Sequence, residues 1–143
     1  MIEKDFVNKI RGKLKKENSK SYCIETGTTT VGFPDLFVMT GLDDYLIEVK
    51  ITHKKLSAEM VIPWRPGQQA WMLEYYLRHK RCKCAWTFVM TEDKQYIFIP
   101  MIKIYNDNKI SLGDPNIYTK GHKEWKASSL SKFLDEKNFY IKL

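Results

Sequence analysis

Long apolar runs are missing from this sequence, and no stretch is long and apolar enough to cross a membrane. The first five residues, Met-Ile-Glu-Lys-Asp, do not begin an apolar segment of the kind found in a secretory signal. Cysteine is scarce, with three in 143 residues, and an odd number with one Cys-x-Cys spacing predicts neither a disulfide framework nor, without nearby histidines, a zinc site. We therefore expect a protein that is not secreted, has no membrane partner and keeps reduced thiols in the cytoplasm, or in a host cytoplasm if it is viral.

Repeats, low-complexity tracts and domain linkers are also absent, and acidic residues are outnumbered by basic ones. The 143 residues are 43% hydrophobic and 13% aromatic, which suits a single domain over residues 1–143. The formal net charge is +7, with seven lysines and arginines against three acids in residues 1–20 and a second basic cluster at residues 78–83. Such a surface suits a nucleic-acid partner, although many basic domains bind none.

Hydrophobic periodicity predicts an α/β fold in the order helix, three strands, helix, strand, strand. Apolar residues at every fourth position predict a helix over residues 2–16. Strands are expected at 22–25, 35–40 and 45–51, followed by a connection without a period over 52–67. A helix over 68–80, apolar nearly all round and therefore expected to be heavily buried, leads to a hairpin of strands 82–90 and 96–99. The strand–helix–strand step favours a crossover onto a central mixed sheet with helices on both faces.

The C-terminal part has turn compositions and few periodic features. We therefore place the core at about residues 1–104 and an irregular extension at about 105–143. Ser128 or Ser129 is a candidate cap for a short final helix ending at Glu136, with its apolar residues turned inward.

The strand at residues 45–51 carries two charges within an apolar run. Alternation places Glu48 and Lys50 on the same face, and burying charge is costly unless it is paired or bound to a metal. Asp35, separated from Glu48 by twelve residues, can be brought beside it by a strand, a turn and a returning strand. Two carboxylates, with the Val49 carbonyl as a possible third donor, suit Mg²⁺ or Mn²⁺. With Lys50 beside them, these groups suit phosphodiester hydrolysis.

Each of these residues also has a purely structural interpretation. Asp35 follows Pro34 and could simply form a turn, and Glu48 with Lys50 could form an ion pair on a solvated strand face. Glu3, on the first helix, either complements the helix dipole or points inward at a site. The tryptophans at positions 64, 71 and 86 fit a core better than a base-stacking surface.

The order and spacing of these residues resemble the PD-(D/E)xK nuclease superfamily. The matching residues are Pro34-Asp35 and Glu48-Val49-Lys50, preceded by Glu3 and followed by Gln68-Gln69-Ala70-Trp71. Within the superfamily, residues 1–90 are most similar to the VRR-NUC domains and to the archaeal- and phage-type Holliday junction resolvases. The resemblance implies a restriction-endonuclease-like core.

The resemblance also implies a role for each matching residue. Asp35 and Glu48 would bind Mg²⁺ or Mn²⁺ together with the Val49 carbonyl. Glu3 would contribute to the metal site directly or through water, and Lys50 would position the nucleophilic water. Gln68 would support the site from its helix, with the adjacent Gln69 as the alternative.

We therefore expect a metal-dependent DNA endonuclease, structure-specific in the manner of a Holliday junction resolvase, acting in recombination, repair or phage replication. Such a single-domain enzyme would act as a homodimer on branched DNA. The candidate DNA contacts are His53, Lys54, Lys55, Arg65 and Lys13. Two alternatives remain: a nucleic-acid-binding module of the same fold without catalysis, and an interaction protein whose acids form structural ion pairs.

Overall fold

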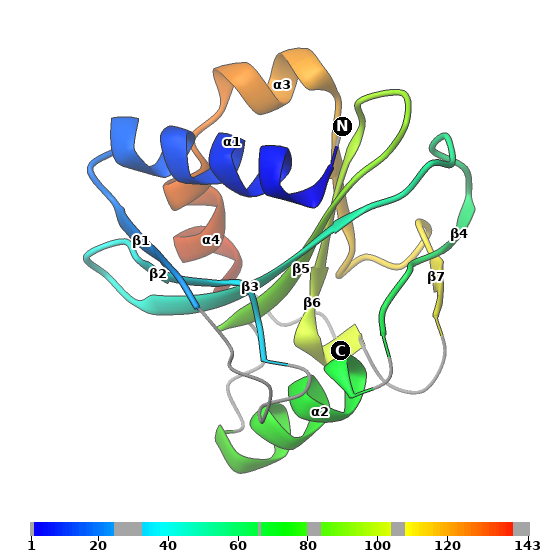
Figure 1. Cartoon of the computed structure of the whole chain (residues 1–143), viewed down its shortest axis with the longest axis horizontal. Helices are drawn as coiled ribbons and strands as arrows, with labels where there is room; N and C mark the ends of the chain where they lie inside the picture. Colours follow the sequence, from blue (N-terminus) through cyan, green and yellow to red (C-terminus); the bar gives the residue numbers. More distant parts are fainter. Residues whose placement is uncertain (1, 25–32, 66, 80–83, 104–107, 139–143) are drawn as a thin grey trace.

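A six-stranded mixed sheet forms the centre of the protein in a computed structural model, which describes residues 2–24, 33–65, 67–79, 84–103 and 108–138 (Figure 1). The strand order is β1-β2-β3-β5-β6-β8, and only β3 and β5 run parallel. The strands are β1 (Lys20–Cys23), β2 (Leu36–Met39), β3 (Asp44–Ile51), β5 (Ala85–Met90), β6 (Tyr96–Pro100) and β8 (Tyr118–Lys120). The prediction of an α/β fold with a mixed sheet and a crossover after β3 is confirmed.

Helices cover both faces of this sheet (Figure 1). Four α-helices are described: α1 (Glu3–Lys16), α2 (Gln68–His79), α3 (His122–Ala127) and α4 (Leu130–Asn138). A 3-10 turn, η1 (Met101–Lys103), follows β6, and β4 (Glu59–Val61) pairs with β7 (Lys109–Ser111) in a separate two-stranded ladder. None of the described helices has the length and hydropathy needed to span a bilayer.

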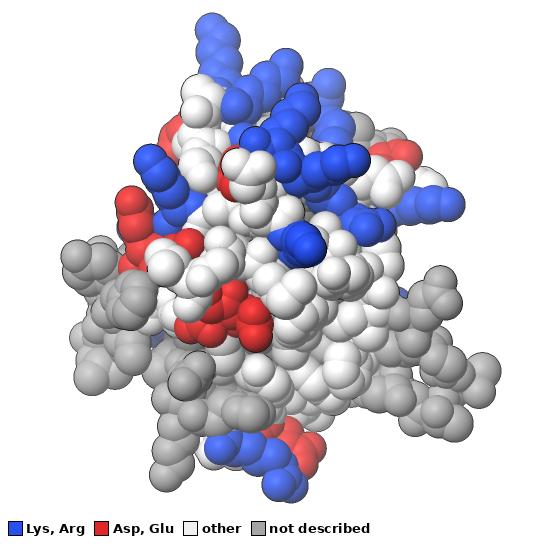
Figure 2. Space-filling view, turned by 90° about the vertical axis from the view of Figure 1, so that its left-hand side faces the viewer, with Lys and Arg blue, Asp and Glu red and all other residues white. Residues whose placement is uncertain are grey.

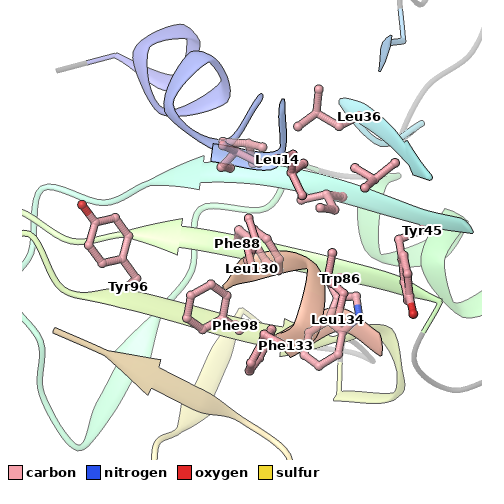
Figure 3. Packing of buried hydrophobic residues seen from close by; sticks show 14 of the residues in the cluster. Leu14, Leu36, Tyr45, Trp86, Phe88, Tyr96, Phe98, Leu130, Phe133 and Leu134 are labelled. Carbon is pink, nitrogen blue, oxygen red and sulfur yellow. The ribbon is translucent and has the colours of Figure 1, made fainter. Parts of the chain in front are cut away.

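The two faces of β3 bury different clusters, as its alternation predicts. Tyr45, Ile47 and Val49 pack with the residues of one core cluster, which Figure 3 shows from close by. Helix α1 contributes Phe6, Ile10 and Leu14 to this cluster, and α4 contributes Leu130, Phe133 and Leu134. On the opposite face, Leu46 belongs to a second cluster with Met60, Trp64 and Met72. Glu48 and Lys50 share the face of Leu46, on the side of α2.

Helix α2 is less buried than its composition predicts. Met72 is 2% exposed, but Trp71 and Tyr75 are only partly buried and Leu77 is 60% exposed. The expectation of heavy burial is therefore wrong for Leu77, because only one side of α2 meets the sheet. The connection expected over residues 52–67 contains β4, whose partner β7 lies far along the chain. The loop expected before Asp35 lies mostly outside the described residues.

Most of the described residues of the C-terminal part belong to helices and strands, so the expectation of an irregular extension is wrong for them. Strand β8 extends the central sheet, and Trp125 of α3 stacks on Tyr96 with ring centroids 4.5 Å apart. The sequence did not predict these elements because each is six residues or shorter and is bounded by turn residues.

The final helix, α4, is confirmed, although it runs two residues beyond the predicted end at Glu136, and Ser129 is the one of the two candidate caps that makes the capping bond. Ser129 Oγ accepts the N–H of Lys132 over 3.2 Å. Glu17 adds to this cap, because its carboxylate accepts the N–H groups of Leu130 and Ser131 at 3.2 and 2.7 Å. Burial would raise the pKa of Glu17, but these hydrogen bonds outweigh burial and hold the pKa below its usual range.

Candidate active site

Asp35 lies at the point where the β2–β3 ladder ends. The last residue pair of that ladder is Leu36 with Ile47, and the Asp35 N–H donates to the Ile47 carbonyl at 3.0 Å. Beyond this pair, the Asp35 Oδ2 atom accepts the backbone N–H of Val49 at 2.7 Å. Because the N–H and C=O of one strand residue point to the same side, the Val49 carbonyl faces the edge that Asp35 occupies. The end of β2 thus brings a carboxylate and a backbone carbonyl to one edge of β3.

Glu48 is buried, with 2% of its surface exposed. Its Oε1 atom accepts a hydrogen bond from Gln68 Nε2 at 3.2 Å and lies 3.8 Å from Lys50 Nζ. Its Oε2 atom is also buried, and no described residue donates a hydrogen bond to it. Burial, followed by the neighbouring Asp35 carboxylate, raises the pKa of Glu48 to about 9, against the opposing charge of Lys50. Two ionised carboxylates repel each other in a buried site, so this pair needs a proton or a cation between its carboxyl groups.

Lys50 is almost completely buried, at 1% exposure, between two acids. Its Nζ atom lies 3.8 Å from Glu48 Oε1 and 3.9 Å from Glu3 Oε1. Glu3 begins α1, which packs on the opposite face of the sheet, and its side chain remains 46% exposed. This ion pair therefore joins the start of α1 to the strand that carries Glu48.

Gln68 fixes Glu48 from the first residue of α2. While Nε2 donates to Glu48, the Gln68 Oε1 atom accepts the N–H of Arg65 at 2.8 Å. Trp64, just before, donates from Nε1 to Thr87 Oγ1 at 3.1 Å, and Thr87 is the β5 partner of Glu48 in the parallel register. Gln68 rather than Gln69 therefore makes the contact with Glu48. The hydrogen bond between Trp64 and Thr87 was not predicted from the sequence. Its one indication there is a threonine within an apolar strand.

The candidate DNA contacts divide into two groups. His53, Lys54 and Lys55 are exposed directly after β3, and Arg65 is exposed three residues before Gln68. These four residues adjoin the segments that carry Lys50 and Gln68. Lys13 lies ten residues along α1 from Glu3, about 15 Å at helical rise, with its Nζ atom 5.5 Å from the centre of the Trp125 ring.

The donor set fits a hard divalent cation, although its acids do not form a large cluster. No group of three or more His, Cys, Asp or Glu side chains suited to a metal occurs among the described residues. Glu3 pairs with Lys50, so the available donors are the Asp35 and Glu48 carboxylates and the Val49 carbonyl. Oxygen donors with room for water suit Mg²⁺ or Mn²⁺, and the Glu48 Oε2 atom without a donor is a position that a cation would satisfy.

Comparison with known proteins identifies the fold. No family model and no curated protein matches the sequence. A solved structure of Hjc from Archaeoglobus fulgidus, a Holliday junction resolvase from an archaeal hyperthermophile, matches with a TM-score of 0.56 and 15% identity over 77% of this chain and 88% of that chain. The fold is restriction-endonuclease-like. At this identity the likeness concerns the fold alone, so the chemistry of the site must be argued from the side chains at the end of β3.

Proposed function

We propose that this protein is a metal-dependent DNA endonuclease that hydrolyses phosphodiester bonds, with branched DNA of the Holliday-junction type as its substrate in recombination, repair or phage replication. The observation that carries this proposal is the convergence of Asp35, Glu48 and Lys50 at one end of β3. This occurs in a fold that is also found in a protein described as a Holliday junction resolvase.

Asp35 and Glu48, with the Val49 carbonyl, are the residues that would hold Mg²⁺ or Mn²⁺. Such an ion, when bound, polarises a phosphoryl oxygen and lowers the pKa of a bound water. The two carboxylates supply negative charge in a partly desolvated site, where it is effective. Gln68 keeps Glu48 in one rotamer, because its own carbonyl is held by the Arg65 N–H.

Lys50 supplies a fixed positive charge beside these carboxylates. Its ammonium can hold the attacking water or compensate the charge that develops on the scissile phosphate. Glu3 and Glu48 restrain this ammonium from two sides, at 3.9 and 3.8 Å, so that it is oriented before substrate binds. Glu3 is thus proposed to act on the site through Lys50, or through water on the metal.

A purely structural ion pair explains this arrangement less well. A buried ion pair is stable only when hydrogen bonds satisfy its remaining lone pairs. The Glu48 Oε2 atom has no donor among the described residues, and a second carboxyl group, that of Asp35, adds like charge beside it. These features support a site that receives a cation over an ion pair that only stabilises the sheet.

Two further parts of the proposal concern assembly and DNA contacts. A resolvase must cut two strands, so we propose that the protein acts as a homodimer with one site for each strand. His53, Lys54, Lys55 and Arg65 are the proposed phosphate contacts near the site.

The test uses labelled four-way junction, flap, linear duplex and single-stranded DNA with Mg²⁺, Mn²⁺ or EDTA. We expect cleavage of branched DNA with either metal and none in EDTA. Asp35→Asn should keep DNA binding and lose cleavage. Binding without cleavage in either metal would favour the non-catalytic module, and cleavage in EDTA would contradict the metal site.

A further inference from the structure

A basic groove lies between α1 and α3, on the layer that covers the sheet face opposite α2. It has a volume of about 520 Å³. Figure 2 shows lysine and arginine side chains gathered over the upper part of the molecule, where α1 and α3 lie in Figure 1. Among the described residues, those that line the groove include no carboxylate; they are Asn8, Lys9, Gly12, Lys13, Lys16, His122, Trp125 and Lys126.

Among the cations of this groove, Lys13 forms an ion pair with Glu17, and the charges that act on His122 are positive. Partial burial lowers the pKa of His122, and the charges that lower it further, those of Lys126, Lys9 and Lys94, are all positive. Lys13 is held in place by Glu17, at 3.8 Å, and by the carbonyl of Lys126, at 3.4 Å. Lysines gathered around a hollow favour the binding of an anion, because an anion relieves the repulsion between their like charges.

A second basic hollow lies on the other flank of α1. It measures about 650 Å³, and none of the described residues that line it carries a carboxylate. Its cations are Arg11, Lys15 and Lys20, and its rim includes Tyr22, which is 50% exposed. Arg11 is fixed there by hydrogen bonds to Ser21 Oγ and to the Ser21 carbonyl, both at 3.2 Å.

Gly12 lines both hollows and separates them on the exposed surface of α1. A glycine within an exposed helix lowers helix stability relative to alanine. Packing does not require it, because a Cβ added at Gly12 would meet no atom within 4 Å. The missing side chain does, however, let a ligand approach the backbone of α1 and pass from one hollow to the other.

We propose that the phosphate backbone of a nucleic acid crosses α1 over Gly12, with its phosphates bound by Lys9, Lys16 and Lys126 in the groove and by Lys15 and Lys20 on the other flank. For its class of partner this inference rests on the proposed function. Because Glu48 and Gln68 face the opposite side of the sheet, the groove binds a different segment from the one that is cut, such as another arm of a branched DNA.

Binding measured without cleavage tests this inference. We would titrate a fluorescent four-way junction with protein in EDTA and follow anisotropy over a series of salt concentrations. The variant K9Q/K16Q/K126Q removes three groove charges and leaves Lys13, which has internal contacts. The control K109Q/K132Q/K137Q removes three charges that line neither hollow, from β7 and α4. Thermal unfolding checks that both variants fold.

Each phosphate contact contributes about −0.9 to the slope of log Kobs against log salt, so the groove variant should have a slope shallower by about two to three. We expect its affinity near 0.1 M salt to fall by about tenfold or more, and that of the control by less than about threefold. Equal losses in the two variants would overturn the inference, as would a wild-type protein that does not bind DNA in EDTA. Retained binding with no cleavage in any metal would instead overturn only the proposed function.

Gly12 provides an independent test. Gly12→Ala adds one methyl group and should raise thermal stability while affinity stays within about twofold. Gly12→Gln also favours the helix but places an uncharged side chain where the backbone would cross, so we expect affinity to fall several-fold. Equal affinities for Gly12→Gln and Gly12→Ala would contradict the crossing over α1.

Discussion

The carboxylate of Asp35 accepts the backbone N–H of Val49 over 2.7 Å, beyond the last residue pair of the β2–β3 ladder. A side chain thus takes the place of the hydrogen bond that a longer β2 would have made. This bond ties Asp35 to the strand that carries Glu48 and Lys50. The spacing of the two carboxyl groups is therefore set by where β2 ends.

Two substitutions separate the structural and chemical roles of Asp35. Asp35→Asn keeps an oxygen for the Val49 N–H and removes the charge, so its unfolding free energy should stay within about 1 kcal/mol of the wild type. Asp35→Ala leaves the buried Val49 N–H without an acceptor and should lose about 1–3 kcal/mol. Both should lose Mn²⁺ binding in calorimetry. Wild-type Mn²⁺ affinity in Asp35→Asn would exclude Asp35 as a ligand.

Gln68 and Gln69 provide a matched pair. Gln68→Ala removes the bonds to Glu48 and to the Arg65 N–H, and we expect cleavage to fall by about 10- to 100-fold, as for other residues that orient a ligand. Gln69→Ala should change cleavage by less than about threefold. Initial rates with each variant check this, and equal effects would show that the contact with Glu48 has no role in activity.

Glu3 and Asp5 both lie in the first turn of α1, where acids complement the helix dipole. Glu3→Gln and Asp5→Asn should each cost at most about 1 kcal/mol of stability for this reason. Of these two variants, Glu3→Gln should slow cleavage, because the Glu3 carboxylate pairs with Lys50. Paired unfolding and cleavage measurements distinguish the two roles. Identical cleavage by the two variants would reduce Glu3 to a residue that stabilises the helix.

The raised pKa of Glu48 predicts how stability depends on pH. Folding raises this pKa from its ordinary value of 4.5 to about 9, so the folded state holds a proton that the unfolded state releases between these pH values. Without divalent metal, stability should therefore be greatest below pH 4.5 as far as Glu48 is concerned, and fall as pH rises toward 9, by roughly 2 kcal/mol or more. Chemical unfolding in EDTA at pH 6 and pH 9 measures the difference.

Glu48→Gln is the control for this dependence, because an amide of the same shape does not titrate. It should flatten the fall in stability between pH 6 and pH 9. A divalent cation should oppose the same fall in the wild type, since metal binding requires the ionised carboxylate. An unchanged pH dependence in Glu48→Gln would assign the effect to another group.

The sequence was sufficient to predict that Asp35, Glu48 and Lys50 come together, because the relevant signals are local, while their roles in catalysis stay predictions. A two-residue period in β3 placed Glu48 and Lys50 on one face, and a strand-turn-strand arrangement brought Asp35 to them. The choice between Gln68 and Gln69 depended on where α2 begins relative to Glu48, which is a tertiary relationship. Glu3 was ambiguous for the same reason, since only the packing of α1 brings it to Lys50.

The outer parts of the fold were harder to predict from the sequence. Strands β4 and β7 have three residues each and pair across a long separation, so neither shows a period of its own. Strand β8 is equally short, and its place beside β6 follows from pairing rather than composition. Leu77 was expected to be buried and is exposed, because an apolar sequence does not determine which side of α2 meets the sheet.

The measurement that tests the account most directly is single-turnover cleavage of a four-way junction by the wild type and by Lys50→Met, with Mg²⁺ and with EDTA. Methionine keeps the volume of the buried side chain and removes its charge, so folding and junction binding should persist. We predict Mg²⁺-dependent cleavage by the wild type and a loss of about 100-fold or more in Lys50→Met. Equal cleavage by the two proteins, or wild-type cleavage that continues in EDTA, would contradict the proposed site at the end of β3.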